Sequence, residues 1–137
     1  MTPSQLHPGS KPVILIIDDE EFYRATLSDA FREQGYRTFV APDGNEGFVL
    51  YRKILPDVVI LDRIMSQSGG TRFLMSVKGL PNRKEGLLVV YSSTVKESGG
   101  TVRESGTQQG FSKVVHISKS TPPDELPGLV QRVATSS

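Results

Sequence analysis

The 137-residue chain contains no cysteine, which excludes disulfide bonds, thiolate metal sites and cysteine catalysis. No apolar stretch approaches the roughly 20 residues that a membrane-spanning helix needs, and no secretory signal pattern opens the chain. The formal net charge is only +1, so no extended surface for nucleic acid or an anionic membrane is indicated. These absences favour a cytoplasmic protein, and the length suits a single domain.

Charged residues stand just past three apolar runs. The runs and their charges are 13–17 with Asp18 and Asp19, 58–61 with Asp62, and 114–117 with Lys119. Continuous apolar runs of this length are typical of buried strands in a parallel sheet. Side chains that follow the carboxyl ends of such strands converge in one cleft. Three carboxylates and one ammonium in that cleft indicate a metal site and a site for an anion.

The whole chain alternates between strand and helix patterns. Residues 1–11 are polar and rich in proline and glycine, and we expect a flexible tail there. The predicted strands are 13–17, 36–40, 58–61, 87–91 and 114–117, and the predicted helices are 21–34, 45–54, 71–79, one within 94–113, and 123–134. Five strand–helix alternations predict an α/β fold, a five-stranded parallel sheet with helices on both faces.

Two of the predicted helices are irregular. The segment 94–113 contains four glycines, and each interior glycine weakens a helix by about 1 kcal/mol relative to alanine. A short or broken helix is therefore expected there. Pro127 lies inside the last predicted helix, where it would remove a backbone hydrogen bond. That helix should start late or kink.

The acidic residues suit a hard cation. Mg²⁺ prefers oxygen ligands and usually takes one or two carboxylates, with water and phosphate oxygens completing the octahedron. Asp18, Asp19 and Asp62 meet that demand, although Asp18 and Asp19 could instead cap the following helix. Lys119 could be an ordinary surface lysine, but beside three carboxylates it is a candidate phosphate partner. Ser92, just past the fourth strand, could donate a hydrogen bond to a phosphoryl oxygen.

These residues together resemble the receiver domain of two-component response regulators. The resemblance covers about residues 12–135, and the segments that carry it are VILIIDDEE (13–21), PDVVILDRIMSQSGG (56–70), LLVVYSST (87–94) and VVHISKS (114–120). It implies a single domain with the flavodoxin-like strand order 2-1-3-4-5. It also implies a cytoplasmic signalling module rather than a turnover enzyme, whose partner is a histidine kinase or a histidine phosphotransfer protein.

The resemblance assigns a role to each residue of the cleft. Asp62 matches the phosphoacceptor, a carboxylate nucleophile that forms an aspartyl phosphate. Asp18, Asp19, Asp62 and the backbone carbonyl of Ile64 match the Mg²⁺ site. Ser92 matches the hydroxyl that binds the phosphoryl group, and Lys119 matches its lysine partner. His116 matches the aromatic switch position, with a partly buried strand histidine as the alternative.

Three departures from the family pattern affect these expectations. Ser66 and Ser120 stand where the family usually has proline. A cis bond before a residue other than proline costs about 2.5–4 kcal/mol, so the Lys119–Ser120 bond should be trans. The segment between Ser92 and Lys119 is longer than usual and rich in glycine, so dimerisation through the neighbouring face by the family's common mode is in doubt.

Two other classes of protein compete with this hypothesis. A pseudo-receiver would keep the fold as a protein-interaction domain without phosphorylation, and the irregular segment after Ser92 favours it. A Mg²⁺-dependent phosphatase with an aspartyl nucleophile would need a second aspartate two residues later. Ile64 stands two residues after Asp62 and Glu20 two residues after Asp18, so the phosphatase is disfavoured.

Overall fold

The computed structural model describes residues 12–62, 70–80, 86–93, 102–108 and 111–135. The strands within these ranges are β1 (Val13–Ile17), β2 (Arg37–Ala41), β3 (Val58–Leu61), β4 (Leu87–Ser92), β5 (Val102–Gln108) and β6 (Phe111–Ser118). The helices are α1 (Glu21–Glu33), α2 (Gly44–Ile54), α3 (Gly70–Lys78) and α4 (Leu126–Thr135), with a 3₁₀ turn over Pro123–Glu125. The predicted tail and most of the predicted loop 66–70 lie outside the described residues.

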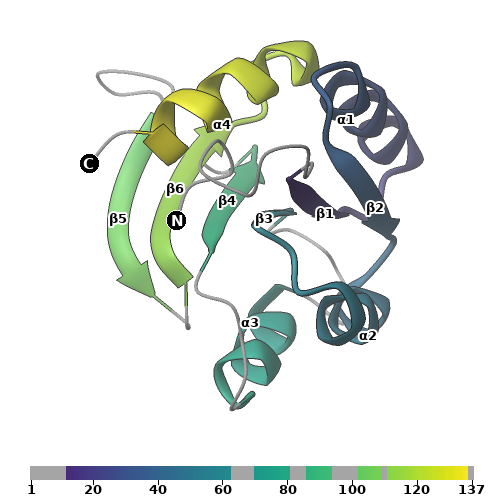
Figure 1. Ribbon diagram of the computed structural model, residues 1–137, viewed down its shortest axis with the longest axis vertical. Helices are drawn as coiled ribbons and strands as arrows, with labels where there is room; N and C mark the ends of the chain where they lie inside the picture. Colours follow the sequence, from purple (N-terminus) through teal and green to yellow (C-terminus); the bar gives the residue numbers. More distant parts are fainter. Residues whose placement is uncertain (1–11, 63–69, 81–85, 94–101, 109–110, 136–137) are drawn as a thin grey trace.

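The strands form one sheet in the order β2-β1-β3-β4-β6-β5 (Figure 1). The first five strands in this order pair in parallel. Counted along the chain, these parallel strands have the order 2-1-3-4-5, so the predicted fold class is confirmed. The apolar runs 13–17 and 58–61 become the adjacent strands β1 and β3, which places the acidic residues that follow them side by side.

The prediction of a helix within 94–113 is wrong for residues 102–108 and 111–113, which the structure describes as strand. Residues 102–108 form β5, which pairs antiparallel with β6 at the edge of the sheet (Figure 1). The register shifts on both sides of Gly106, as a bulge at a residue without a side chain allows. The glycines that weaken a helix at this position are therefore compatible with an irregular edge strand, whose backbone hydrogen bonds are made to β6.

The core lies on both faces of the sheet because the side chains of each strand alternate between them. Along β1, Ile14 and Ile16 pack with α1 and α4, whereas Leu15 and Ile17 pack with α2 and α3. All four side chains are fully buried. This two-sided burial explains why the strands are continuous apolar runs rather than alternating ones.

The helix ends follow local steric rules. Gly35, just after α1, has a φ of +91°, a conformation that glycine adopts at little cost. Asp43 caps α2, because its side chain accepts a hydrogen bond from the Glu46 N–H (2.9 Å). Pro127 is the second residue of α4, so the last helix starts late, as predicted. None of the described helices combines the length and apolar character needed to cross a membrane.

Candidate active site at the carboxyl ends of the strands

Backbone hydrogen bonds continue beyond the ends of the strands and hold the predicted site residues in place. The Asp62 N–H donates to the Ile17 carbonyl (3.0 Å), and the Asp18 N–H donates to the Ala41 carbonyl (3.1 Å). On the other side of the cleft, the Lys119 N–H donates to the Ser92 carbonyl (3.2 Å). The main chain therefore holds these side chains at the carboxyl ends of the strands, as the sequence predicted.

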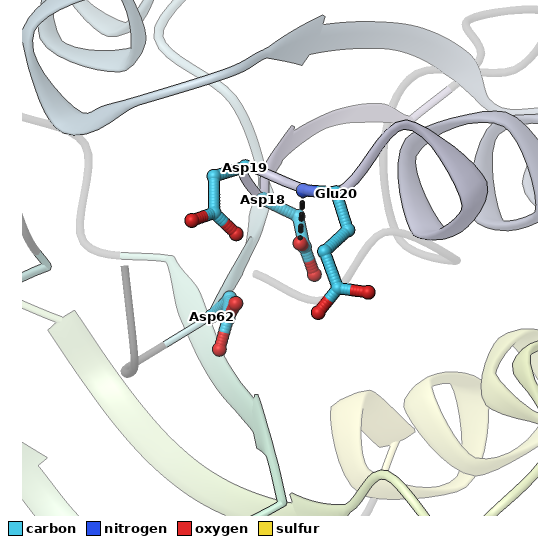
Figure 2. A group of neighbouring side chains, drawn as sticks. All are labelled: Asp18, Asp19, Glu20 and Asp62. Carbon is cyan, nitrogen blue, oxygen red and sulfur yellow. Dashed lines mark hydrogen bonds between the residues drawn. The ribbon is translucent and has the colours of Figure 1, made fainter. Parts of the chain in front are cut away.

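Four carboxylates lie close together at the carboxyl ends of β1 and β3 (Figure 2). Each of Asp18, Asp19, Glu20 and Asp62 offers an oxygen, and these oxygens lie within 4.8 Å of one another. Asp18 and Asp62 are buried, whereas Asp19 and Glu20 are exposed. The sequence did not predict Glu20 as a member of this cluster. Its position directly after Asp18 and Asp19 could have indicated it.

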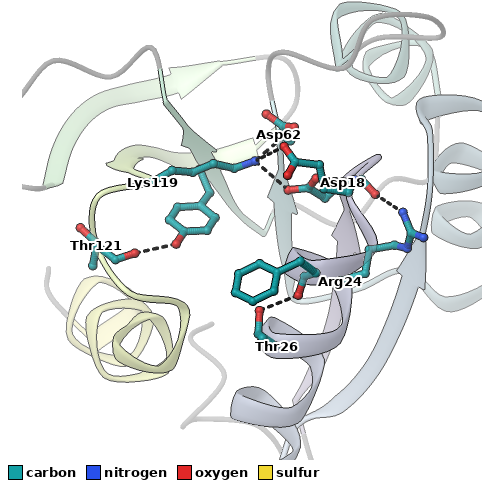
Figure 3. Close-up of polar contacts among 9 residues, drawn as sticks. Asp18, Arg24, Thr26, Asp62, Lys119 and Thr121 are labelled. Carbon is teal, nitrogen blue, oxygen red and sulfur yellow. Dashed lines mark hydrogen bonds and ion pairs between the residues drawn. The ribbon is translucent and has the colours of Figure 1, made fainter.

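Lys119 lies between the two buried carboxylates (Figure 3). Its Nζ is 3.1 Å from Asp18 Oδ2 and 3.3 Å from Asp62 Oδ2, and its side chain is only 8% exposed. Burial alone would lower the pKa of Lys119, but its attraction to Asp18 and Asp62 outweighs burial and raises that pKa. The lysine is therefore a fixed positive charge of the cleft and not an ordinary surface residue.

Asp18 is held from several sides. Its Oδ1 accepts a hydrogen bond from the Glu20 N–H (2.9 Å), and its carbonyl accepts one from Arg24 Nη1 (2.8 Å). The N-cap of α1 is Glu20, whose side chain makes no capping hydrogen bond. Burial raises the pKa of Asp18 against the lowering effects of the Glu20 N–H and of Lys119. The contact with Glu20 thus orients Asp18 toward the cleft without making it the helix cap.

Ser92 and His116 lie on the same face of the sheet. Their neighbours in the strands, Val90 and Val114, both pack against the core on the α2 and α3 side, and side chains two residues apart share a face. Ser92 is fully buried, and His116 is 8% exposed. In the parallel register Ser92 pairs with Ser118 and His116 pairs with Val90, so Ser92 is the nearer of the two to the ends of the strands.

The donor set of this cleft fits a small hard cation. Carboxylate oxygens from Asp18, Asp19 and Asp62 are the ligands that Mg²⁺ prefers, and a divalent charge would relieve their mutual repulsion. Ile64, whose carbonyl the resemblance assigned to the metal, lies outside the described residues. The Lys119–Ser120 bond is trans, so this prediction is confirmed.

Comparison with known proteins identifies the family. The sequence model of the response regulator receiver domain family matches residues 14–131. The chain therefore belongs to that family. Receiver domains are signalling modules of two-component systems that act as phosphoacceptors. They generally bind Mg²⁺ at an acidic pocket and interact with histidine kinases or phosphotransfer proteins.

Two curated relatives illustrate the similarity. The chain is 34% identical over 90 residues to Regulatory protein AtoC of Escherichia coli, covering 66% of this chain and 20% of that protein. It is 35% identical over 65 residues to Sporulation initiation phosphotransferase F of Bacillus subtilis, covering 47% and 52% of the two chains. The matched segments thus span only about a fifth and about half of these relatives.

Solved structures share the fold. The chemotaxis protein CheY4 of Vibrio cholerae superimposes with a TM-score of 0.71 at 24% identity, over 90% of this chain and 99% of that one. The receiver domain of the Francisella response regulator 1452 gives a TM-score of 0.68 at 21% identity, over 90% and 97%. At this level of identity the similarity describes the architecture.

Proposed function

We propose that this protein is a phosphoacceptor module of a two-component phosphorelay, with Asp62 as the acceptor. A carboxylate oxygen of Asp62 attacks the phosphorus of a phosphohistidine on a histidine kinase or a phosphotransfer protein. A phosphorus–oxygen bond forms, the phosphorus–nitrogen bond breaks, and the imidazole leaves with its electron pair. The observation that carries the proposal is Lys119, which lies 3.3 Å from Asp62 and 3.1 Å from Asp18 in a cleft at the ends of the strands.

The metal site is the second part of the proposal. Asp18, Asp19, Asp62 and the backbone carbonyl of Ile64 would hold Mg²⁺. When bound, the ion neutralises negative charge on the transferring phosphoryl group. Asp18 is buried and already oriented by the Glu20 N–H, so part of the ligand set is ordered before an ion binds.

Lys119 and Ser92 would act on the phosphoryl group itself. The ammonium of Lys119 places a positive charge beside the acceptor oxygen, where transferring phosphoryl oxygens carry negative charge. Ser92 would donate its hydroxyl hydrogen to one of these oxygens. His116 would then respond to the movement of Ser92, since both side chains lie on the same face of the sheet. The added phosphoryl charge would thereby alter the surface that partners bind.

The extent and setting of the module also belong to the proposal. We assign residues 12–135 to the receiver domain and residues 1–11 to a flexible tail. The module would act in the cytoplasm through protein partners, with no direct binding to nucleic acid or membrane. Its catalysis would be limited to its own phosphorylation and dephosphorylation.

The test is phosphorylation by a small phosphodonor in the presence of Mg²⁺, followed by mass spectrometry of the intact protein. One phosphoryl group should be added to the wild-type protein, and none to the Asp62→Asn variant or to wild type in EDTA. Asp57→Asn is a matched control, because Asp57 is a buried aspartate at the opposite end of β3. Equal labelling of wild type and Asp62→Asn would contradict the assignment of the acceptor.

A pseudo-receiver is the alternative, and the edge strand β5 favours it. Residues predicted to form part of a helix instead pair with β6, the strand that carries His116, so this side of the sheet departs from the predicted arrangement. A pseudo-receiver would give no spectral or mass response to Mg²⁺ with beryllium fluoride, a phosphoryl mimic. A response in wild type that is absent in Asp62→Asn would exclude it.

A further inference from the structure

Two tyrosines flank the ammonium of Lys119. Its Nζ lies 4.0 Å from the centroid of the Tyr23 ring and 5.9 Å from that of Tyr91. The two rings meet edge to face, with centroids 5.7 Å apart. Tyr23 comes from α1, and Tyr91 is fully buried in β4. The lysine therefore has carboxylates on one side and aromatic rings on another.

The hydroxyl of Tyr91 restrains the segment that follows Lys119. It donates a hydrogen bond of 2.6 Å to the Thr121 carbonyl. Burial raises the pKa of Tyr91 well above its usual range, so the hydroxyl remains a donor. The Thr121 N–H in turn donates to the Ser118 carbonyl (2.9 Å). A turn that carries Lys119 is thus tied to β4 on one side and to β6 on the other.

We propose that Tyr23 and Tyr91 are positioning residues for Lys119, with the Tyr23 ring holding its ammonium and the Tyr91 hydroxyl holding its backbone turn. A cation over an aromatic face is attracted to the ring without a hydrogen bond. The N–H groups of Lys119 therefore stay available for the carboxylates and for an incoming phosphoryl oxygen. The kinetic consequence of this placement rests on the proposed function, whereas the placement itself does not.

The placement can be measured directly by NMR. Protons on the terminal methylene of Lys119 should be shifted upfield by the ring current of Tyr23, and the signal is assigned by its loss in Lys119→Arg. Tyr23→Leu should abolish the upfield shift, while Tyr23→Phe should retain it because the ring remains. Tyr36→Leu is the matched control. Tyr36 is also partly buried and packs against the same core cluster as Tyr23, but it follows the opposite end of α1.

The functional arm measures the rate of Asp62 phosphorylation by a small phosphodonor at saturating Mg²⁺. Tyr23→Leu should slow it roughly three- to tenfold, and Tyr23→Phe should behave as wild type. Tyr91→Phe, which keeps the ring and removes the hydrogen bond to Thr121, should slow it roughly two- to fivefold. Tyr36→Leu should destabilise the protein by about as much as Tyr23→Leu does. It should leave the rate of Asp62 phosphorylation unchanged.

The outcomes separate the two hypotheses. An unchanged Lys119 signal in Tyr23→Leu, or an equal change in Tyr36→Leu, would overturn the positioning role of Tyr23. A Tyr91→Phe rate equal to wild type would overturn the role of the Tyr91 hydroxyl. Failure of the wild type to become phosphorylated would refute the proposed function. In that case the NMR comparison alone would still decide whether Tyr23 holds the lysine.

Discussion

Replacing Lys119 with methionine removes the positive charge between Asp18 and Asp62 and keeps a side chain of similar length. The exposed fractions are 8% for the lysine side chain, 3% for Asp18 and 4% for Asp62. Little water can therefore take the place of the ammonium. In the absence of metal, the variant loses the ammonium that these two buried carboxylates share.

The expected loss follows from the distances. At an effective dielectric constant of about 20, each ion pair near 3.2 Å is worth roughly 5 kcal/mol of direct attraction. The carboxylate oxygens lie within 4.8 Å of one another, so a repulsion of at least roughly 3.5 kcal/mol remains after the lysine is removed. Breaking a buried ion pair by removing one partner typically costs about 3–5 kcal/mol. We expect Lys119→Met to lose about 3–5 kcal/mol of unfolding free energy.

Urea denaturation in EDTA, followed by circular dichroism, measures this loss. Lys53→Met is the matched control, because Lys53 is exposed on α2 and its replacement should change stability by less than about 0.5 kcal/mol. Added Mg²⁺ should stabilise Lys119→Met more than wild type, since the divalent ion supplies the missing positive charge. A loss below about 1 kcal/mol, the value of an exposed ion pair, would refute the conclusion that these charges form a buried cluster.

Four further substitutions have predicted effects on stability, and urea denaturation measures each. Because burial raises the pKa of Asp18, the stability of metal-free Asp18→Asn relative to wild type should rise as pH increases above about 4 and through the folded pKa. Gly86→Ala should destabilise by about 1–3 kcal/mol, because its new Cβ would clash with the Asp57 backbone carbonyl oxygen. Gly128→Ala, with open space around it in α4, should stabilise by up to about 1 kcal/mol. Asp43→Ala should lose about 1 kcal/mol with the cap of α2.

Each of these predictions has a contradicting result. A stability of Asp18→Asn relative to wild type that falls with rising pH would show that the pKa of Asp18 is lowered and not raised. Equal effects of Gly86→Ala and Gly128→Ala would mean that the close backbone approach at Gly86 is unimportant. An unchanged stability of Asp43→Ala would show that its hydrogen bond contributes nothing to α2.

The sequence anticipated the central sheet because its strands are buried on both faces. Such strands must be apolar along their whole length, and the runs 13–17, 58–61 and 87–91 show this pattern in the sequence. The polar residues that follow them were predictable for the same reason, since a charged or polar side chain ends a buried run. The strand at 102–108 was not predictable, because glycine-rich sequence is compatible with several structures and it is pairing with β6 that gives these residues a partner for their backbone groups.

The sequence by itself determined which residues could do chemistry: Asp18, Asp19, Asp62, Ser92 and Lys119 all stand at ends of apolar runs. Only the tertiary structure decided how they act on one another. It brings Glu20 into the carboxylate cluster and sets the ammonium of Lys119 between two buried acids, against rings from α1 and β4. Such contacts join residues far apart along the chain, and they depend on which strands become neighbours, a property that no local pattern encodes.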